Sequence, residues 1–192
     1  SEDVQDVVRG ISTGVRRMRS LVSSLHQLSK LESISIEREV CDLPSVVAEG
    51  RSLAAIALEE SKAAVVVDAL PRVQGSSELL AQLFQNLFSN ACKYAGDSPP
   101  RIRIWSEVNH ERGVDLVYFE DRGVGIPLKS QERVFESFHR LHHSDDIEGT
   151  GIGLSICRRI VQAHDGKLYI DPDYADGVRF VIALPLSVSG GA

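Results

Sequence analysis

The sequence has few cysteines, no long apolar run and no cluster of basic residues. Its three cysteines, Cys41, Cys92 and Cys157, are widely spaced among apolar residues, which favours reduced, buried thiols over disulfides or metal ligands. No apolar stretch approaches the roughly 20 residues that span a bilayer, and we expect no signal peptide. We therefore expect a soluble, cytoplasmic segment without direct membrane contact, although a longer parent protein could be membrane-anchored. The net charge of −6, from 21 basic and 27 acidic residues, argues against nucleic-acid binding.

The first 33 residues differ from the rest of the chain. They contain no proline, and their apolar residues recur at alternating spacings of four and three. This heptad pattern predicts a long, coiled-coil-like helix that packs against another helix. We expect this helix at 1–34, one compact domain at 35–187 and a tail of small residues at 188–192. The predicted seam consists of Val4, Val8, Ile11, Val15, Met18, Val22 and Leu25.

The remaining sequence alternates short strands and helices. A buried strand at 65–70 and a hairpin of two long strands within 101–120 are expected from their apolar patterns. Such a mixture predicts a two-layer α/β sandwich with helices on one face of a mixed sheet. The other expected strands are 35–41, 167–170 and 178–186, and the expected helices are 44–60, 77–94, 129–141 and 152–164.

Polar residues form one stripe of the predicted helix at 77–94. Gln82, Asn86, Asn90, Lys93 and Tyr94 recur at spacings of three and four, and an apolar stripe lies opposite them. An amide oxygen is a neutral Mg²⁺ ligand, and an ammonium group pairs with phosphate. The stripe therefore indicates a metal-bridged triphosphate site, and the alternative is an ordinary solvated helix face.

Asp121 ends an apolar strand and precedes a turn that contains Gly123, Gly125 and Ile126. A carboxylate can accept the exocyclic amino proton of adenine, whereas it would repel the carbonyl of guanine. Hydrogen bonds to charged groups contribute about 1.5–3 kcal/mol, enough to discriminate the two bases. The two glycines let the backbone pass close to the base. The alternative is an Asp-Gly turn that binds nothing.

A third motif, Gly149-Thr150-Gly151-Ile152-Gly153-Leu154, leads directly into a predicted helix. Unpaired amides at such a helix start can bind phosphate oxygens. The motif lacks the Gly-Lys-Ser/Thr ending of a Walker loop, and it does not follow a strand in a βαβ unit. Only its place after the other two motifs gives it weight.

In this order, the three motifs resemble the catalytic domain of sensor histidine kinases, which has the Bergerat ATP-binding fold shared with gyrase and Hsp90. The resemblance extends over about residues 41–186. The asparagine box matches Asn86, Asn90, Lys93 and Tyr94; the first glycine box Asp121, Gly123 and Gly125; the phenylalanine box Phe135 and Phe138; the second glycine box Gly149, Gly151 and Gly153.

The resemblance implies ATP and Mg²⁺ as cofactors and assigns a role to each motif. Asn90 would bind Mg²⁺, Asn86, Lys93 and Tyr94 would lie near the phosphates, and Asp121 would bind the adenine amino group. The resemblance places Arg140 at the terminal phosphate, so the expected catalytic residues are Asn86, Lys93 and Arg140. Residues 139–148 would form a short lid over ATP. The expected ATP contacts also include Gly123, Gly125, Ile126, Phe138, Gly149, Thr150, Gly151, Ile152, Gly153 and Leu154.

The first 33 residues resemble the second helix of the hairpin that carries dimerisation and the phosphoacceptor in these kinases. The first helix of that hairpin has a His-Glu/Asp-x-Arg-x-Pro pattern, which this sequence lacks. We expect His26 to be a surface histidine. The implied function is transfer of the ATP γ-phosphate to a histidine outside this chain, for relay to the receiver domain of a response regulator. The partners would be the phosphoacceptor hairpin, a dimer partner and that regulator.

Two substitutions and one cluster refine this interpretation. Hydrolytic relatives such as gyrase have a glutamate at the place of Asn86, and an amide cannot act as a general base, so phosphotransfer is favoured over hydrolysis. The late glycine box keeps Gly177 but lacks the usual threonine after it. His139, His142 and His143 match no standard metal-ligand spacing and fit an exposed lid better.

Two alternatives stay open. The chain could be a non-catalytic scaffold, from a degenerate or truncated kinase, that binds nucleotide and dimerises. It could also be a serine kinase of the anti-sigma type, which has the same fold, although those compact proteins lack the long heptad helix.

Overall fold

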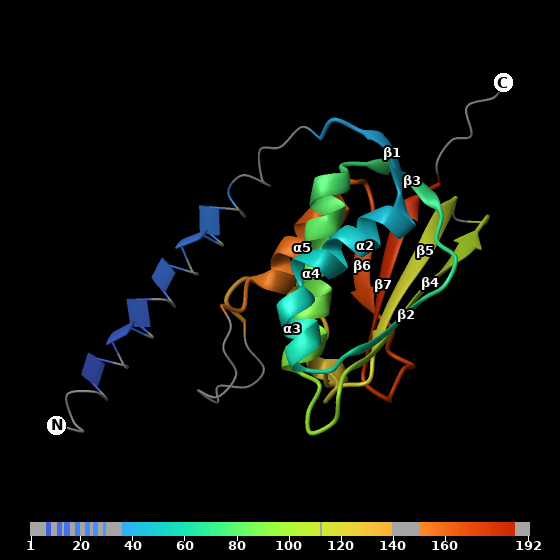
Figure 1. Ribbon diagram of the computed structural model, residues 1–192. Coiled ribbons are helices and arrows are strands. Elements are labelled where there is room, and N and C mark those ends of the chain that lie inside the picture. The colour runs from blue at the N-terminus through green and yellow to red at the C-terminus, as the bar shows by residue number, and fades with distance from the viewer. Residues whose placement is uncertain are drawn as a thin grey trace.

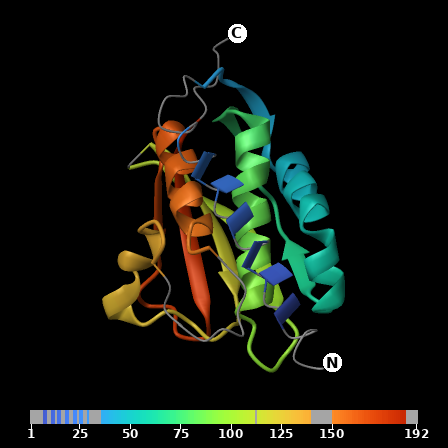
Figure 2. The same ribbon diagram turned by 90° about the vertical axis from the view of Figure 1, so that its left-hand side faces the viewer.

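A two-layer α/β sandwich forms the body of the molecule. The computed structural model describes residues 36–111, 113–139 and 150–186, together with isolated helical positions between residues 7 and 29. Five strands form a sheet in the order β2-β4-β5-β7-β6, and the helices cover one of its faces (Figures 1 and 2). The predicted architecture is therefore confirmed. The elements are β2 (Ala64–Val67), β4 (Arg101–Asn109), β5 (Val114–Asp121), β6 (Lys167–Ile170), β7 (Val178–Pro185), α2 (Leu43–Leu53), α3 (Ala55–Glu60), α4 (Ser77–Lys93) and α5 (Gly153–Ala163).

The sheet is mixed, as the sequence predicted. β2 pairs with β4 in parallel, and the other strand pairs are antiparallel. β4 and β5 form the expected hairpin. A second, two-stranded sheet joins β1 (Glu39–Asp42) to β3 (Arg72–Gly75). β3 was not predicted, because its four residues contain only one large apolar side chain, Val73.

Helix α4 forms the centre of the helical layer. Its predicted apolar stripe is buried, since each of its members is at most 2% exposed. Ser76 caps the helix by accepting a hydrogen bond from the amide of Leu79 at 3.4 Å. Gly50 of α2 packs so closely on α4 that a Cβ there would lie 2.7 Å from the Cβ of Phe84. The buried stripe is Leu80, Leu83, Phe84, Leu87, Phe88 and Ala91.

Two of the predicted helices are wrong in detail. The segment 44–60 breaks at Ala54, which has a non-helical backbone (φ −100°, ψ 9°), so that α2 and α3 form separately. The described part of the segment 129–141, up to residue 139, contains two single 3-10 turns, η1 (Leu128–Ser130) and η2 (Arg133–Phe135). In these two turns only Val134 and Phe135 are buried, so no continuous apolar stripe supports a longer helix in this part.

The strand predicted at 65–70 is shorter and more exposed than expected. β2 ends at Val67, and Val66 is 55% exposed. The reason is its position: β2 is the edge strand of the sheet and pairs only with β4. An apolar run of this length is compatible with either a central or an edge strand, and periodicity cannot distinguish them.

The described positions between residues 7 and 29 are helical. Members of the predicted heptad seam among them, from Val8 to Leu25, are 53–67% exposed in the single chain. Pairing of this seam with another helix stays a prediction. Val4 and the predicted tail at 188–192 lie outside the described residues. Within the described part of the chain, no helix is both long and apolar enough to cross a membrane.

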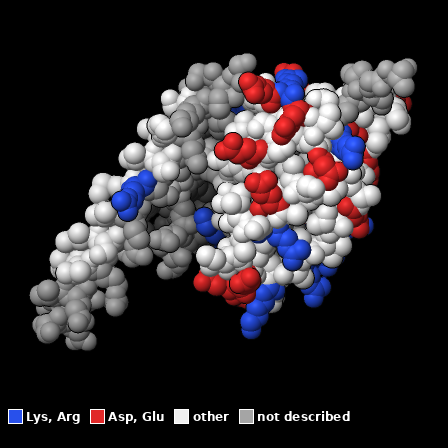
Figure 3. Space-filling model, turned by 45° about the horizontal axis from the view of Figure 1, so that its top comes forward, with Lys and Arg blue, Asp and Glu red and all other residues white. Residues whose placement is uncertain are grey.

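Charges of both signs are distributed over the surface. In the view of Figure 3, acidic side chains are spread over the face of the domain, with Lys and Arg side chains between and below them. On this face the acidic side chains therefore do not form a single patch.

A buried histidine connects the end of α5 to the start of α4. His164 is 1% exposed; its Nδ1 lies 2.7 Å from the carbonyl oxygen of Ile160, and its Nε2 accepts a hydrogen bond from the amide of Ser76 at 3.0 Å. These two bonds require the neutral ring with the proton on Nδ1. Burial lowers the pKa of His164 below its ordinary value of 6.5.

Acidification should therefore reduce stability through His164. Because its pKa is lower in the folded chain, the unfolded chain binds the proton first, and the free energy of unfolding falls as the pH drops below the ordinary pKa. Asp121, whose folded pKa is raised, acts in the opposite direction, so the effect must be measured as a difference between variants. We expect His164→Gln to be less stable than wild type at neutral pH and to lose less stability on acidification.

Urea unfolding at about pH 7.5 and about pH 5.5 measures both quantities. His26→Gln is the comparison variant, because it removes an exposed histidine and leaves the hydrogen bonds of His164 in place. An unchanged pH dependence in His164→Gln would show that this ring does not link protonation to unfolding.

Candidate nucleotide-binding site

The polar stripe of α4 lies outside the hydrophobic core. Asn86, Asn90 and Tyr94 are partly exposed, and Lys93 is exposed. The Nδ2 of Asn86 donates a hydrogen bond to the carbonyl of Gln82 at 3.1 Å. Its Oδ1 points to the start of α5, where a Cβ built on Gly153 would lie 3.5 Å from it. The Asn86 side chain therefore presents its oxygen, and not its amino group, to the space beside α5.

Asp121 occupies the buried end of β5. Its cross-strand neighbours are the apolar residues Ile102 and Val178, and it is only 6% exposed. Its Oδ1 accepts a hydrogen bond from the amide of Gly123 at 3.0 Å, and no other residue of the described chain bonds to Oδ2. Burial raises the pKa of Asp121 to about 7, the Glu120 carboxylate adds to this rise, and the Gly123 amide opposes it.

The turn after Asp121 is attached to the end of α4. The amide of Val124 donates to the carbonyl of Tyr94 at 2.9 Å. Gly123 makes this contact possible, because a Cβ there would overlap the Tyr94 carbonyl oxygen. Gly125 has a positive φ of 75°. The glycines of this motif therefore bring the carboxylate of Asp121 next to the polar stripe of α4.

Gly123→Ala should destabilise the domain by about 1–3 kcal/mol, because the new methyl group overlaps backbone that no rotamer change can move. Gly153→Ala is the control, since its Cβ would make an ordinary contact of 3.5 Å and should change stability by less than about 0.5 kcal/mol. Chemical denaturation measures both. Equal effects of the two substitutions would contradict the close approach at Gly123.

The second glycine motif forms the start of α5. The helix begins at Gly153, and no side chain of the described residues caps it. Gly151 has a positive φ of 70°, and Ile152 is buried. The first amides of α5 are thus available to an anion. Gly149 lies outside the described residues, as does Arg140.

The two phenylalanines of the predicted phenylalanine box have different environments. Phe135 is buried against Phe180, with ring centroids 6.4 Å apart, and the guanidinium of Arg158 lies 4.1 Å from its ring centre. Phe138 is 56% exposed and has a positive φ of 68°, which is strained for a bulky residue. Its amide donates to the carbonyl of Gly151 at 3.0 Å.

Phe138 also borders a hollow of about 440 Å³ between α5 and the N-terminal helical positions. The hollow joins parts of the chain that are far apart in sequence. Its lining consists of Leu25, Ser29, Phe135, Ser137, Phe138, Ser155, Arg158, Arg159 and Gln162.

The sequence did not reveal three residues that shape the site. Val178 is the cross-strand partner of Asp121 on β7, and Glu120 and Arg179 form the adjacent pair of the same two strands. The alternating pattern of each strand could indicate which face these residues occupy. Their pairing depends on β5 and β7 being neighbours, which the sequence pattern did not specify.

These features define a class of protein. The polar face of α4 lies next to the turn that follows the buried carboxylate of Asp121 and next to the uncapped start of α5. Such a combination of groups is typical of nucleotide-binding domains. The sequence matches the histidine kinase-, DNA gyrase B-, and HSP90-like ATPase family over residues 75–188. The chain belongs to this family.

Three known proteins illustrate the likeness. The phytochrome-like protein Cph1 of Synechocystis sp. is 33% identical over 185 residues, which are 96% of this chain and 24% of Cph1. The mycobacterial sensor histidine kinase MprB has a TM-score of 0.65 at 28% identity, covering 78% of this chain and 97% of that structure. The histidine kinase ThkA in complex with the response regulator TrrA has a TM-score of 0.72 at 23% identity, covering 96% and 52%, and shows the fold alone.

The family match and MprB confirm the resemblance to the catalytic domain of sensor histidine kinases. The chain spans about a quarter of the length of the phytochrome-like relatives it matches.

Proposed function

We propose that this chain binds Mg-ATP and presents its γ-phosphate to a histidine outside the chain, as the catalytic part of a two-component sensor kinase. One observation carries the proposal: the face of α4 meets both glycine motifs. Near its end, Tyr94 bonds to the turn that follows Asp121; one helical turn before Asn90, Asn86 faces Gly153. A nucleotide on this face would have its base at Asp121 and its phosphates at the start of α5.

The base end of the site supports adenine. Asp121 keeps one oxygen bonded to Gly123 and offers the other, as an acceptor, to an amino group. Adenine supplies such a group, and guanine presents a carbonyl at the same place. Gly123 lets the Tyr94 carbonyl approach the turn that carries Asp121, and Ile126 packs against the core beside it.

The phosphate end combines an uncapped helix start with amide and ammonium side chains. The amides at 151–154 would bind phosphate oxygens, and Lys93 and Tyr94 would lie along the phosphate chain. Arg140, for which the family resemblance implies contact with the terminal phosphate, is part of the same proposal. Such a site acts mainly by positioning and by charge neutralisation.

The donor set fits Mg²⁺. Asn86 and Asn90 lie one turn apart on α4, both partly exposed, and Mg²⁺ prefers oxygen ligands. The Nδ2 of Asn86 donates to the carbonyl of Gln82 in the same helix, so the Oδ1 of Asn86 is the atom that faces the site. We assign Asn90 as the ligand, with Asn86 beside the phosphates; bound Mg²⁺ would neutralise phosphate charge.

The side chains at the site favour transfer over hydrolysis. An amide at position 86 cannot remove a proton from water, and its Nδ2 is already bonded to Gln82. The acceptor would then be an imidazole on a helical hairpin, from which a response regulator takes the phosphoryl group. The hollow beside Phe138, which the N-terminal helical positions border, is where we place the approach of that hairpin. We place these events in the cytoplasm.

Incubation with γ-labelled ATP tests the proposal. A hairpin that carries a phosphoacceptor histidine is added to this chain, and the acid-labile label on each protein is measured. Label on the hairpin only when this chain is present supports the kinase. Nucleotide binding without any label on the hairpin would favour the second candidate, a nucleotide-binding dimerisation scaffold, for which the exposed heptad seam is the supporting observation.

A further inference from the structure

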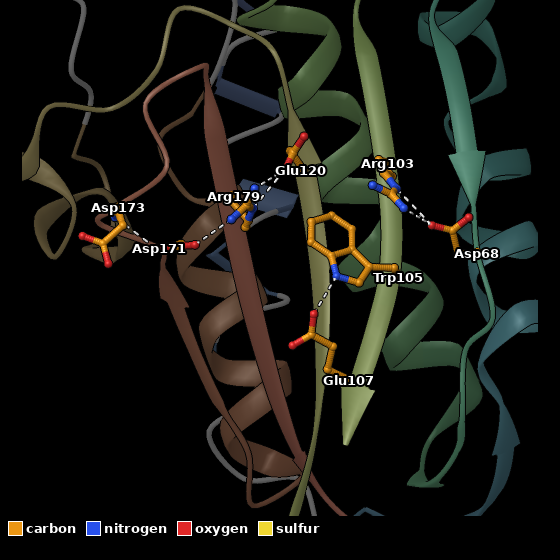
Figure 4. Close-up of polar contacts among 8 residues, drawn as sticks. All are labelled: Asp68, Arg103, Trp105, Glu107, Glu120, Asp171, Asp173 and Arg179. Carbon is orange, nitrogen blue, oxygen red and sulfur yellow. Dashed lines mark hydrogen bonds and ion pairs between the residues drawn. The ribbon is translucent and has the colours of Figure 1, made fainter. Parts of the chain in front are cut away.

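A cluster of ion pairs lies on the sheet face opposite the helices, directly behind Asp121. Arg179 of β7 donates from Nε and Nη2 to one oxygen of Glu120, at 2.9 and 2.7 Å, and from Nη1 to Asp171 at 2.9 Å. Figure 4 shows the guanidinium between the two carboxylates. Glu120 is 13% and Asp171 22% exposed in their side chains. Partial burial strengthens the attraction between these charges and also adds a desolvation cost.

Aromatic rings hold the guanidinium in place. Its central carbon lies 4.3 Å from the ring centre of Tyr174 and 5.3 Å from that of Trp105. Trp105 is in turn stacked on Tyr118, with centroids 4.8 Å apart. A planar, always charged guanidinium suits this place between rings and carboxylates, and a lysine would not reproduce its geometry.

The cluster is connected to Asp121 through the backbone. Glu120 and Asp121 are consecutive and face opposite sides of the sheet, and their β7 partners are Arg179 and Val178. The turn from Asp171 ends at Gly177, which packs so tightly on Asp121 that a Cβ there would overlap its carbonyl oxygen. Arg179 therefore bonds both to the strand that carries Asp121, through Glu120, and to the turn that packs against Asp121, through Asp171.

The charges of the cluster also act on Asp121. The Glu120 carboxylate raises the pKa of Asp121, and Arg179 neutralises Glu120 at 2.7 Å. Other ionisable groups on the surrounding elements are Arg122, Arg101 of β4, Lys93 and Tyr94 at the end of α4, and Asp176 in the turn before β7. Burial is the main cause of the raised pKa of Asp121. Among the described residues, Glu120 is the charged side chain whose electrostatic repulsion raises that pKa further.

We propose that Arg179 is a positioning residue for the nucleotide site: it holds Glu120 and the 171–177 turn, and it offsets the Glu120 charge so that Asp121 is presented to the base as a carboxylate. The role in binding rests on the proposed function. The effect on the Asp121 carboxyl does not, and it can be measured without nucleotide.

The test compares Arg179→Met with Arg38→Met. Arg38 is the control, because it also forms an arginine–aspartate ion pair, with Asp165, and that ion pair follows the C-terminal end of α5 and includes neither Glu120 nor Asp171. The carboxyl carbon of Asp121 is titrated by NMR, and ATP affinity is measured by calorimetry across the same pH range. Circular dichroism verifies that each variant is folded, and Arg179→Gln, which keeps a hydrogen-bond donor without the charge, substitutes if the Met variant does not fold.

In Arg179→Met we expect the titration of Asp121 to move to higher pH, and ATP affinity at neutral pH to fall about fivefold, with the loss shrinking as the pH rises. Adding Glu120→Gln should return the titration toward its wild-type position, because the uncompensated charge is then gone. A merely structural role would produce no such rescue. An unmoved Asp121 titration in Arg179→Met, or an equal shift in Arg38→Met, would overturn the proposal. Failure of wild type to bind ATP would instead refute the proposed function.

Discussion

Asp121→Asn is expected to weaken ATP binding about 10- to 100-fold, because a charge-assisted hydrogen bond contributes about 1.5–3 kcal/mol. The asparagine oxygen can keep the bond from the Gly123 amide. Its amino group then occupies the place of Oδ2 and opposes the amino group of adenine, donor against donor. Isothermal calorimetry of wild type and variant measures the loss.

The fold should survive this substitution. Burial raises the pKa of Asp121 to about 7, so the ionised carboxylate is disfavoured by the folded state, and its stability cost appears as the pH rises above the ordinary value. Replacing it by a neutral amide should leave the free energy of unfolding equal or slightly higher at alkaline pH. Lost ATP binding together with a lost fold would therefore not support the assignment.

Asp115→Asn is the matched control for this experiment. Asp115 lies on the same strand and the same buried face as Asp121, and is 4% exposed, but it occupies the other end of β5. Burial raises its pKa as well. The Asp115→Asn substitution should leave ATP affinity unchanged. An affinity loss in Asp115→Asn as large as that in Asp121→Asn would contradict the assignment of Asp121 to the adenine base. It would show that ATP affinity depends on either buried carboxyl of β5.

Phe88→Ala is expected to destabilise the domain by about 3–5 kcal/mol, as is typical for a fully buried phenylalanine. Phe88 is 0% exposed and packs edge-to-face on Phe119, with centroids 5.3 Å apart. This contact fixes α4 on β5 and so fixes the distance between the asparagines and Asp121. Urea unfolding measures the loss.

Phe138→Ala provides the comparison, because Phe138 is 56% exposed and its truncation should change the free energy of unfolding by less than about 0.5 kcal/mol. A small loss in Phe88→Ala, close to that of Phe138→Ala, would mean that α4 is not held on the sheet by this ring.

The sequence predicted what local periodicity determines. The polar and apolar stripes of α4 follow from helical spacing alone, and every member of the apolar stripe is buried as expected. The hairpin of β4 and β5 and the position of Asp121 at the end of a strand follow from alternation and from the glycine turn. The helix start at Gly153 differs by one residue from the prediction.

Features that depend on contacts distant in sequence could not be predicted in this way. Arg179 and Glu120 are 59 residues apart, and only the adjacency of β7 and β5 brings them together. Strand β3 exists because β1 pairs with it, not because its own pattern is strong. The two 3-10 turns at 128–130 and 133–135 stand where a helix was predicted, because only Val134 and Phe135 are buried in them.

The central claim is that α4, β5 and the start of α5 form one adenine-nucleotide site. Calorimetry of the wild-type chain with Mg-ATP and with Mg-GTP tests it most directly. We expect one ATP to bind per chain, and GTP to bind at least about tenfold more weakly, because the Asp121 carboxylate meets a carbonyl in guanine. Equal affinities for the two nucleotides, or no binding of ATP, would contradict the account.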